Sequence, residues 1–179
     1  MFRSSFALFL LILALSDFGA TATAAEELPA YVRSPYRGRV SAWLGRNAEF
    51  RIAMDADCAC TEDIANQRTG GGAWPPNSMF HPYFVVGDFA GDGAVDVAVG
   101  VVAHSAPKQF RVLILHGAST KGTKRADFLS EPFPLSNNGI FYGEPRPKPW
   151  RLIVGAFAAE GQVFVPQSRG YTLEDGEEG

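Results

Sequence analysis

The order of apolar and polar residues predicts two short helices in the first part of the chain. Residues 34–46 have the spacing of one helix face. Apolar side chains recur there three and four positions apart, at Val40, Trp43 and Leu44. A second helix is expected over residues 61–67, whose first turn carries acidic side chains that suit a helix N-terminus.

The second part of the chain is typical of β-strands. Short runs of Val, Ile, Leu and Phe are separated by segments with Gly, Pro and Asn, which favour turns. The expected strands cover residues 49–54, 83–86, 95–102, 110–115, 140–142, 150–157, 162–166 and 171–173. Because helices precede strands, we expect an α+β fold in which short N-terminal helices pack on a mainly antiparallel β-sheet.

The first 25 residues have the organisation of a secretory signal peptide. Arg3 precedes an apolar run, and small residues at 19–25 offer cleavage positions. The run is shorter than the roughly 20 apolar residues that span a bilayer, so no membrane span is expected after cleavage. Residues 26–173 are then expected to form one globular domain, followed by an acidic flexible tail over 174–179. These features predict a periplasmic or secreted protein.

Composition and charge narrow the choice of partners. Apolar residues make up 46% of the chain and aromatic residues 12%, enough for a core, and the formal net charge is -3. That charge argues against nucleic acid as a main partner. Five arginines in the N-terminal part of the domain form either a solvated surface or a site for an anionic ligand. They are Arg33, Arg37, Arg39, Arg46 and Arg51.

Three aspartates stand four residues apart in the sequence VVGDFAGDGAVDVAVG, residues 85–100. The spacing would align Asp88, Asp92 and Asp96 on one helix face, but the glycines inside the segment oppose a helix. The β-branched flanks favour a strand, a loop and a second strand instead. Carboxylates crowded in one loop repel each other, and a bound divalent cation would remove that repulsion. Hard oxygen ligands favour Ca²⁺.

The loop lacks the third acidic position and the closing Glu of an EF-hand. Its sequence GDFAGDGAVDVAVG instead resembles the calcium loop of the FG-GAP/VCBS repeats found in integrin-α-type β-propellers. The resemblance implies a β-hairpin around Ca²⁺. The residues that match the ligands of the family are the side chains of Asp88, Asp92 and Asp96 and the backbone carbonyl of Ala94. Ala90 stands where the family has Asn or Asp, so water would have to supply that ligand.

The chain carries a single copy of this motif, whereas a closed propeller needs roughly four blades or more. We therefore expect a small domain with one such hairpin and not a closed propeller. A metal-free interpretation stays open, because an Asp-Gly pair forms a turn when the Asp side chain binds its own backbone. Asp92-Gly93 is such a pair.

Cys58 and Cys60 are separated by one residue. In an exported protein a local disulfide is the first interpretation. Free or intermolecular thiols are the second, and a zinc or copper site with a histidine such as His81 is the third. His104 and His116 stand in no pattern of catalytic residues, and the motifs GxSxG and HExxH are absent from the sequence.

Together these patterns predict an exported, non-enzymatic module whose aspartate-rich hairpin loop is stabilised by Ca²⁺. Such a module would bind a protein or a glycan of the cell envelope. Two other functions stay open: a hydrolase whose site the sequence does not locate, and a metal-free interaction or inhibitor protein.

Overall fold

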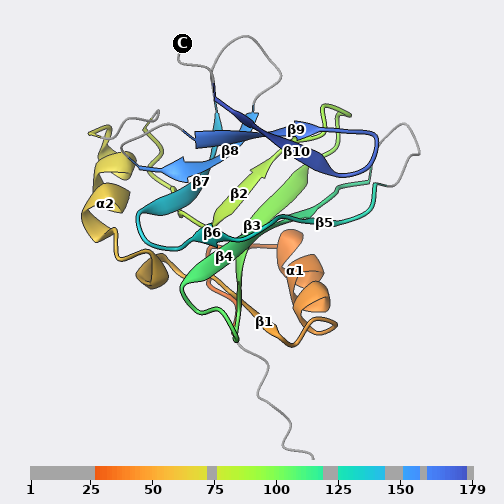
Figure 1. Ribbon diagram of the computed structural model, residues 1–179, viewed down its shortest axis with the longest axis horizontal. Coiled ribbons are helices and arrows are strands. Elements are labelled where there is room, and N and C mark those ends of the chain that lie inside the picture. The colour runs from red at the N-terminus through yellow and green to blue at the C-terminus, as the bar shows by residue number, and fades with distance from the viewer. Residues whose placement is uncertain (1–26, 72–75, 119–124, 144–150, 158–160, 177–179) are drawn as a thin grey trace, which may run out of the picture.

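Two α-helices precede most of the strands (Figure 1). The computed structural model describes residues 27–71, 76–118, 125–143, 151–157 and 161–176. The helices are α1 (Tyr36–Leu44), the 3-10 helix η1 (Asp55–Cys58) and α2 (Thr61–Thr69). The strands are β1 (Phe50–Ile52), β2 (Phe84–Gly87), β3 (Asp96–Ala103), β4 (Gln109–Leu115), β5 (Phe128–Leu129), β6 (Phe133–Pro134), β7 (Asn138–Gly143), β8 (Arg151–Ala156), β9 (Gly161–Pro166) and β10 (Tyr171–Asp175).

The strands form two sheets in which neighbouring strands are antiparallel. The six-stranded sheet has the order β1-β3-β4-β5, with β2 also paired to β3 and β6 to β4. The four-stranded sheet has the order β10-β9-β8-β7. The sheets do not close into a barrel. The predicted α+β fold with mainly antiparallel strands and no closed propeller is therefore confirmed.

The central strand β3 is covered on both faces. Side chains of Val97, Val99 and Val101 belong to a cluster that also contains Val40 and Trp43 of α1. The alternate side chains belong to the larger cluster between the two sheets. Figure 1 shows the same layers, with α1 below the six-stranded sheet and the four-stranded sheet above it. Burial on both faces explains why the strand is an almost unbroken apolar run.

The two sheets meet closely where β2 approaches β7. The backbone N–H of Ile140 donates to the carbonyl of Pro82 at 2.7 Å. A Cβ added to Gly87 would lie 2.2 Å from Cε1 of Tyr142, so only glycine fits beside this ring. The Tyr142 hydroxyl also accepts a hydrogen bond from the backbone N–H of Asp88 at 3.1 Å. The first residue of the aspartate loop is thereby attached to the second sheet.

The structure differs from the sequence expectations mainly at element ends. Helix α1 begins at Tyr36 and ends at Leu44, two residues inside each end of the predicted range, and Pro35 occupies its N-cap. The short strands β5 and β6 were not expected. Strand β10 includes Glu174 and Asp175, which pair with Val163 and Gln162, whereas the sequence assigns both acids to the tail.

Several sequence expectations fall on residues 1–26, 72–75, 119–124, 144–150, 158–160 and 177–179, outside the described residues. They include the signal peptide and residues 177–179, half of the predicted acidic tail. Among the helices of the described ranges, none has the length and apolar character needed to cross a bilayer.

Candidate functional site

The aspartate loop connects two strands, as its sequence predicts. Strands β2 and β3 are antiparallel, and Gly87 pairs with Asp96 where they enter the loop. Gly91 and Gly93 adopt φ values of 67° and 84°. Glycine reaches this left-handed region at no steric cost, so these two residues let the backbone turn tightly between the aspartates.

Two of the three carboxylates bind the backbone of their own loop. The Asp88 oxygens accept hydrogen bonds from the N–H of Asp92 at 3.0 Å and from the N–H of Gly93 at 2.9 Å. The Asp92 side chain accepts one from the N–H of Ala94 at 2.9 Å. These contacts close a turn inside the loop and lessen the mutual repulsion of the carboxylates.

The third carboxylate is turned into the protein. Asp96 is only 1% exposed. Its oxygens accept hydrogen bonds from the N–H of Phe89 at 3.2 Å and from the N–H of Gly117 at 2.8 Å. Nδ1 of the buried His116 ring lies 3.2 Å from Asp96 Oδ1, although it is not aligned for a hydrogen bond. A buried charge needs such partners, because its desolvation otherwise costs several kcal/mol.

A calcium site at the loop would need several converging oxygen ligands. Ca²⁺ takes roughly six to eight oxygen ligands. Within the described ranges, no three or more His, Cys, Asp or Glu side chains are grouped so that they could hold a metal ion. The expected ligands are Asp88, Asp92, Ala94 and Asp96. The Asp96 oxygens accept hydrogen bonds from Phe89 and Gly117, so this carboxylate would have to ligate through its remaining lone pairs. Calcium binding here stays a prediction.

One buried tyrosine lies near these acids. The ring of Tyr171 stacks with that of His116 at a centroid distance of 5.7 Å and an interplanar angle of 7°. Its hydroxyl is buried and has no hydrogen-bond partner. Burial, and then the negative charge of Asp96, raise the pKa of Tyr171 above its usual value. The negative charge of Asp96 in the loop therefore acts on Tyr171, a side chain in the core of the four-stranded sheet.

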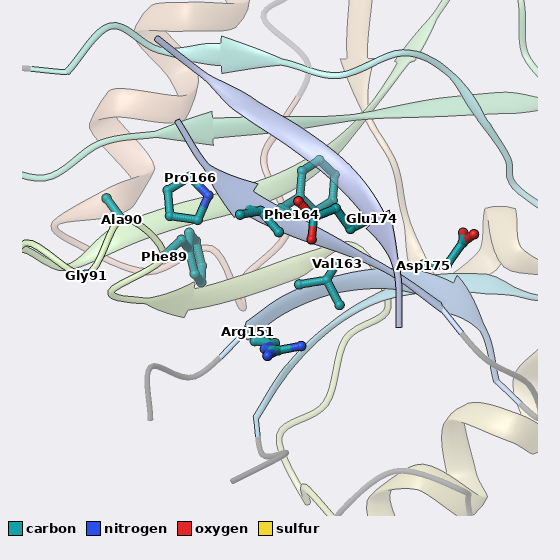
Figure 2. A pocket seen from close by; sticks show the side chains of 10 residues that line it. Phe89, Ala90, Gly91, Arg151, Val163, Phe164, Pro166, Glu174 and Asp175 are labelled. Atoms are coloured by element: carbon teal, nitrogen blue, oxygen red, sulfur yellow. The ribbon is translucent and has the colours of Figure 1, made fainter. Parts of the chain in front are cut away.

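A groove of about 370 Å³ lies beside the loop, against the four-stranded sheet (Figure 2). Residues 89–91 of the loop and 163–166 of β9 supply a mostly apolar lining. Three exposed charged residues complete it: Arg151 at the start of β8, and Glu174 and Asp175 at the end of β10. Figure 2 shows Arg151 and Asp175 on different sides of Val163. The groove thus combines an apolar floor with charges of both signs.

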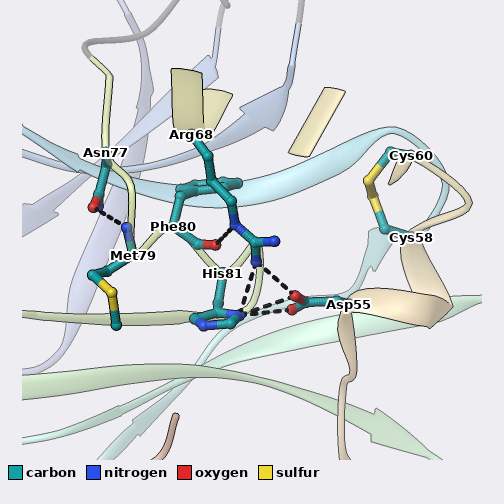
Figure 3. A network of polar contacts seen from close by, with 8 residues as sticks. All are labelled: Asp55, Cys58, Cys60, Arg68, Asn77, Met79, Phe80 and His81. Atoms are coloured by element: carbon teal, nitrogen blue, oxygen red, sulfur yellow. Dashed lines mark hydrogen bonds and ion pairs between the residues drawn. A yellow bond between two sulfur atoms is a disulfide. The ribbon is translucent and has the colours of Figure 1, made fainter. Parts of the chain in front are cut away.

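A second group of polar side chains joins η1, α2 and the segment before β2 (Figure 3). Oδ2 of Asp55 lies 2.9 Å from Nδ1 of His81 and 3.0 Å from a guanidinium nitrogen of Arg68. Nε of Arg68 donates to the carbonyl of Phe80 at 2.9 Å. We call Asp55, Arg68 and His81 the Asp55 network. Its side chains are between 19% and 35% exposed, so the network is accessible to solvent.

The neighbouring Asp57 is held by Arg51. The two make hydrogen bonds of 2.7 and 2.9 Å, and the Asp57 carboxylate also accepts from the backbone N–H of Met54 at 2.7 Å. Burial alone would raise the pKa of Asp57, but these hydrogen bonds and the charge of Arg51 outweigh it, so the pKa is lowered. Arg51 therefore binds its own chain, as do Arg37 and Arg39, which reach backbone carbonyls.

Cys58 and Cys60 are bonded to each other, with their Cα atoms 5.1 Å apart. Both are buried. Since the sulfurs form a disulfide, a zinc or copper site made of two thiolates and His81 lacks its thiolates in this state. Of the other histidines, His104 is exposed and His116 lies beside Asp96.

The Asp55 network and the groove were both missed by the sequence analysis. His81 is named there only as a candidate metal ligand beside Cys58 and Cys60 and is not connected with Asp55 or Arg68. The partners of Asp55 stand 13 and 26 positions away, so no local pattern indicates the network. The groove has no local signal, because its residues come from four separate segments of the chain.

Comparisons with known proteins give no identification: no family model, no curated protein and no solved structure matches the chain. The resemblance to FG-GAP/VCBS repeats therefore rests on the loop motif alone.

Proposed function

We propose that the chain is an exported, non-enzymatic module that binds a protein or a glycan of the cell envelope through the groove beside the aspartate loop. The groove is the observation that carries the proposal. Its volume lies at the lower end of the range typical of ligand sites, roughly 300 to 1,000 Å³. An apolar floor with a few charges at the rim is the usual composition of such sites.

The chemistry of the groove favours binding over hydrolysis. Its lining, as far as the chain is described, holds no His, Ser, Thr or Cys that could act as a base or nucleophile. Its two acids, Glu174 and Asp175, are neighbours on strand β10. Both stand at the same end of one strand, so the pair is not placed on opposite sides of a substrate, as two carboxylates that flank a scissile glycosidic bond would be. A hydrolase with a site elsewhere remains the alternative.

The aspartate loop has a supporting role in the proposal. Its first residue is attached to Tyr142, and residues 89–91 line the groove. Any change that loosens the turn at Asp88 and Asp92 would therefore change one wall of the groove. We extend the proposal to calcium: an ion bound at the loop would be structural and would stabilise this wall.

Variants of the groove test the binding role. Arg151→Glu reverses an exposed charge, and Ala90→Trp fills the groove with a large side chain. Both should weaken binding to envelope proteins or to arrayed envelope glycans by roughly tenfold or more. Arg46→Glu is the matched control, because Arg46 is exposed beyond α1, on the other side of the six-stranded sheet. Equal binding by all variants, or no binding by the wild type, would overturn the proposal.

Thermal melts test the calcium part separately. Calcium that binds only the folded state raises the unfolding midpoint by mass action. We expect a higher midpoint with CaCl₂ than with a chelator, and no difference in Asp92→Asn. An unchanged wild-type midpoint would remove calcium from the proposal and leave the groove untouched, which favours the metal-free interaction protein.

A further inference from the structure

We propose that Met79 and His81 form a binding site for a soft monovalent metal ion, Cu(I) or its analogue Ag(I). The ligands would be the thioether sulfur of Met79 and Nε2 of His81. This site is separate from the groove and independent of the calcium loop.

The His81 ring is prepared for a metal by its carboxylate partner. Asp55 lies 2.9 Å from Nδ1, so the ring donates from Nδ1 and keeps its lone pair on Nε2. A metal-binding histidine almost always has such a carboxylate or carbonyl on its other nitrogen, which fixes the tautomer and raises the basicity of the ligand. The ring of Tyr31 stacks on His81 at 3.8 Å and 19°, which fixes its orientation further.

Met79 supplies the soft ligand. It is 58% exposed, one of the two large apolar side chains most exposed among the described residues. The hydrogen bond from its N–H to Oδ1 of Asn77, 3.0 Å long, fixes the backbone of the turn. The side chain itself lies open to solvent, where a thioether gains nothing from the hydrophobic effect. Thioether sulfur selects soft ions such as Cu(I).

The backbone places the two ligands on one side of the chain. Phe80 stands between them, and its ring is buried against Phe141 and Phe157. The Met79 side chain is exposed and that of His81 is 19% exposed, so both ligands can be reached from solvent. Met79 stands in a turn in which the N–H of Phe80 donates to the carbonyl of Asn77 at 2.9 Å. Only Phe80 separates it from His81, so the long, flexible Met79 side chain can reach toward the His81 ring. Figure 3 shows Met79 on the side of the His81 ring that faces away from Asp55.

Charge and ligand number favour a monovalent soft ion. Arg68 lies 3.3 Å from Nδ1 of His81, and its positive charge would oppose a divalent ion. Asp55 offsets this charge through its 3.0 Å contact with Arg68. Zinc usually takes four ligands in protein sites, whereas Cu(I) and Ag(I) accept two or three.

Titration of the purified full chain, without a histidine tag, tests the site. AgNO₃ is followed by ¹H–¹³C NMR of the methionine methyl groups, and Cu(I) by competition with a chromophoric chelator. One equivalent of either ion should shift the Met79 methyl signal. Asp55→Asn keeps an oxygen beside Nδ1 but removes the charge, and should lower affinity roughly ten- to hundred-fold. Met79→Leu and His81→Asn should lower it further.

The chain offers matched controls of both residue types. Met54→Leu changes the other described methionine, which is half-buried, and His104→Asn changes an exposed histidine. Both should bind the ions like the wild type, and all variants should keep the wild-type melting midpoint within a few degrees. Absence of Ag(I) binding, or equal affinity of Met79→Leu and the wild type, would overturn the proposal. Neither result would bear on the groove.

Discussion

Two acid-rich segments of this chain differ in the groups that bind their carboxylates. In the aspartate loop, Asp88, Asp92 and Asp96 bind backbone N–H groups. In η1, the acids bind side chains: Asp55 meets Arg68 and His81, and Asp57 meets Arg51. The first segment buries one carboxylate almost completely, whereas the second keeps its carboxylates partly exposed.

The difference follows from where the partners stand in the sequence. Glycines inside the loop let the chain fold back, so most donors for its carboxylates come from the same few residues. The acids of η1 have no such freedom, and their partners stand 6, 13 and 26 positions away. A fixed network of opposite charges forms an accessible polar surface, whereas backbone donors fix the shape of a turn.

Removal of the buried acid should have the largest effect. Asp96→Ala leaves the N–H groups of Phe89 and Gly117 without their acceptor, and we expect a loss of about 3 kcal/mol in the free energy of unfolding. Asp55→Ala removes a half-exposed ion pair and should cost about 1 kcal/mol. Urea unfolding of both variants measures the two costs. Equal costs would show that the burial of Asp96 does not distinguish the two segments.

Much of the fold could be predicted, because its signals are local. The valine-rich run at 95–102 and FRVLIL at 110–115 became β3 and β4, the central pair of the six-stranded sheet. The strands β5 and β6 were missed, since each has only two residues and β6 ends in a proline, which disfavours a strand. Such short strands form only because β4 lies beside them.

The same distinction between local and long-range contacts applies to the candidate sites. The turn in the aspartate loop could be predicted from Asp-Gly chemistry within nine residues. Where Asp96 points could not be predicted, because one of its donors, Gly117, lies 21 residues away. The groove and the Asp55 network depend wholly on residues that the fold brings together. Tertiary contacts of this kind leave no periodic signal in a single sequence.

Lowering the pH should show how much the Asp57–Arg51 ion pair of η1 contributes to stability. Hydrogen bonds from Arg51 and Met54 lower the pKa of Asp57 in the folded protein below its ordinary 3.8, despite the opposing effect of burial. The stability that this pair contributes is present above pH 3.8 and is lost as pH falls through the lower, folded value. At neutral pH we expect Asp57→Asn to be about 1 kcal/mol less stable than the wild type.

Urea unfolding at a series of pH values measures this difference. The gap between wild type and Asp57→Asn should narrow below pH 3.8, because protonation removes the charge that the variant already lacks. A gap that stays constant down to the lowest pH would show that the pair is held by shape and not by charge.

High pH should give the smallest effect on stability, and the effect should be similar in both segments. Burial, followed by the charges of Asp55 and Asp57, raises the pKa of Tyr31, and burial followed by Asp96 does the same for Tyr171. A raised folded pKa means that the contribution to stability is complete below the unfolded value of 10.0 and is lost as pH rises above it.

Phenylalanine variants separate this effect from lost hydrogen bonds. Both hydroxyls are buried without a partner, so Tyr31→Phe and Tyr171→Phe should change stability by at most about 0.5 kcal/mol at neutral pH. Above pH 10 both variants should lose less stability than the wild type. Tyr83→Phe is the control: its hydroxyl donates to the carbonyl of Leu135 at 2.9 Å, and its removal should cost about 1 kcal/mol already at neutral pH. An equal neutral cost for all three would mean that the hydroxyls of Tyr31 and Tyr171 have partners in solution, such as buried water.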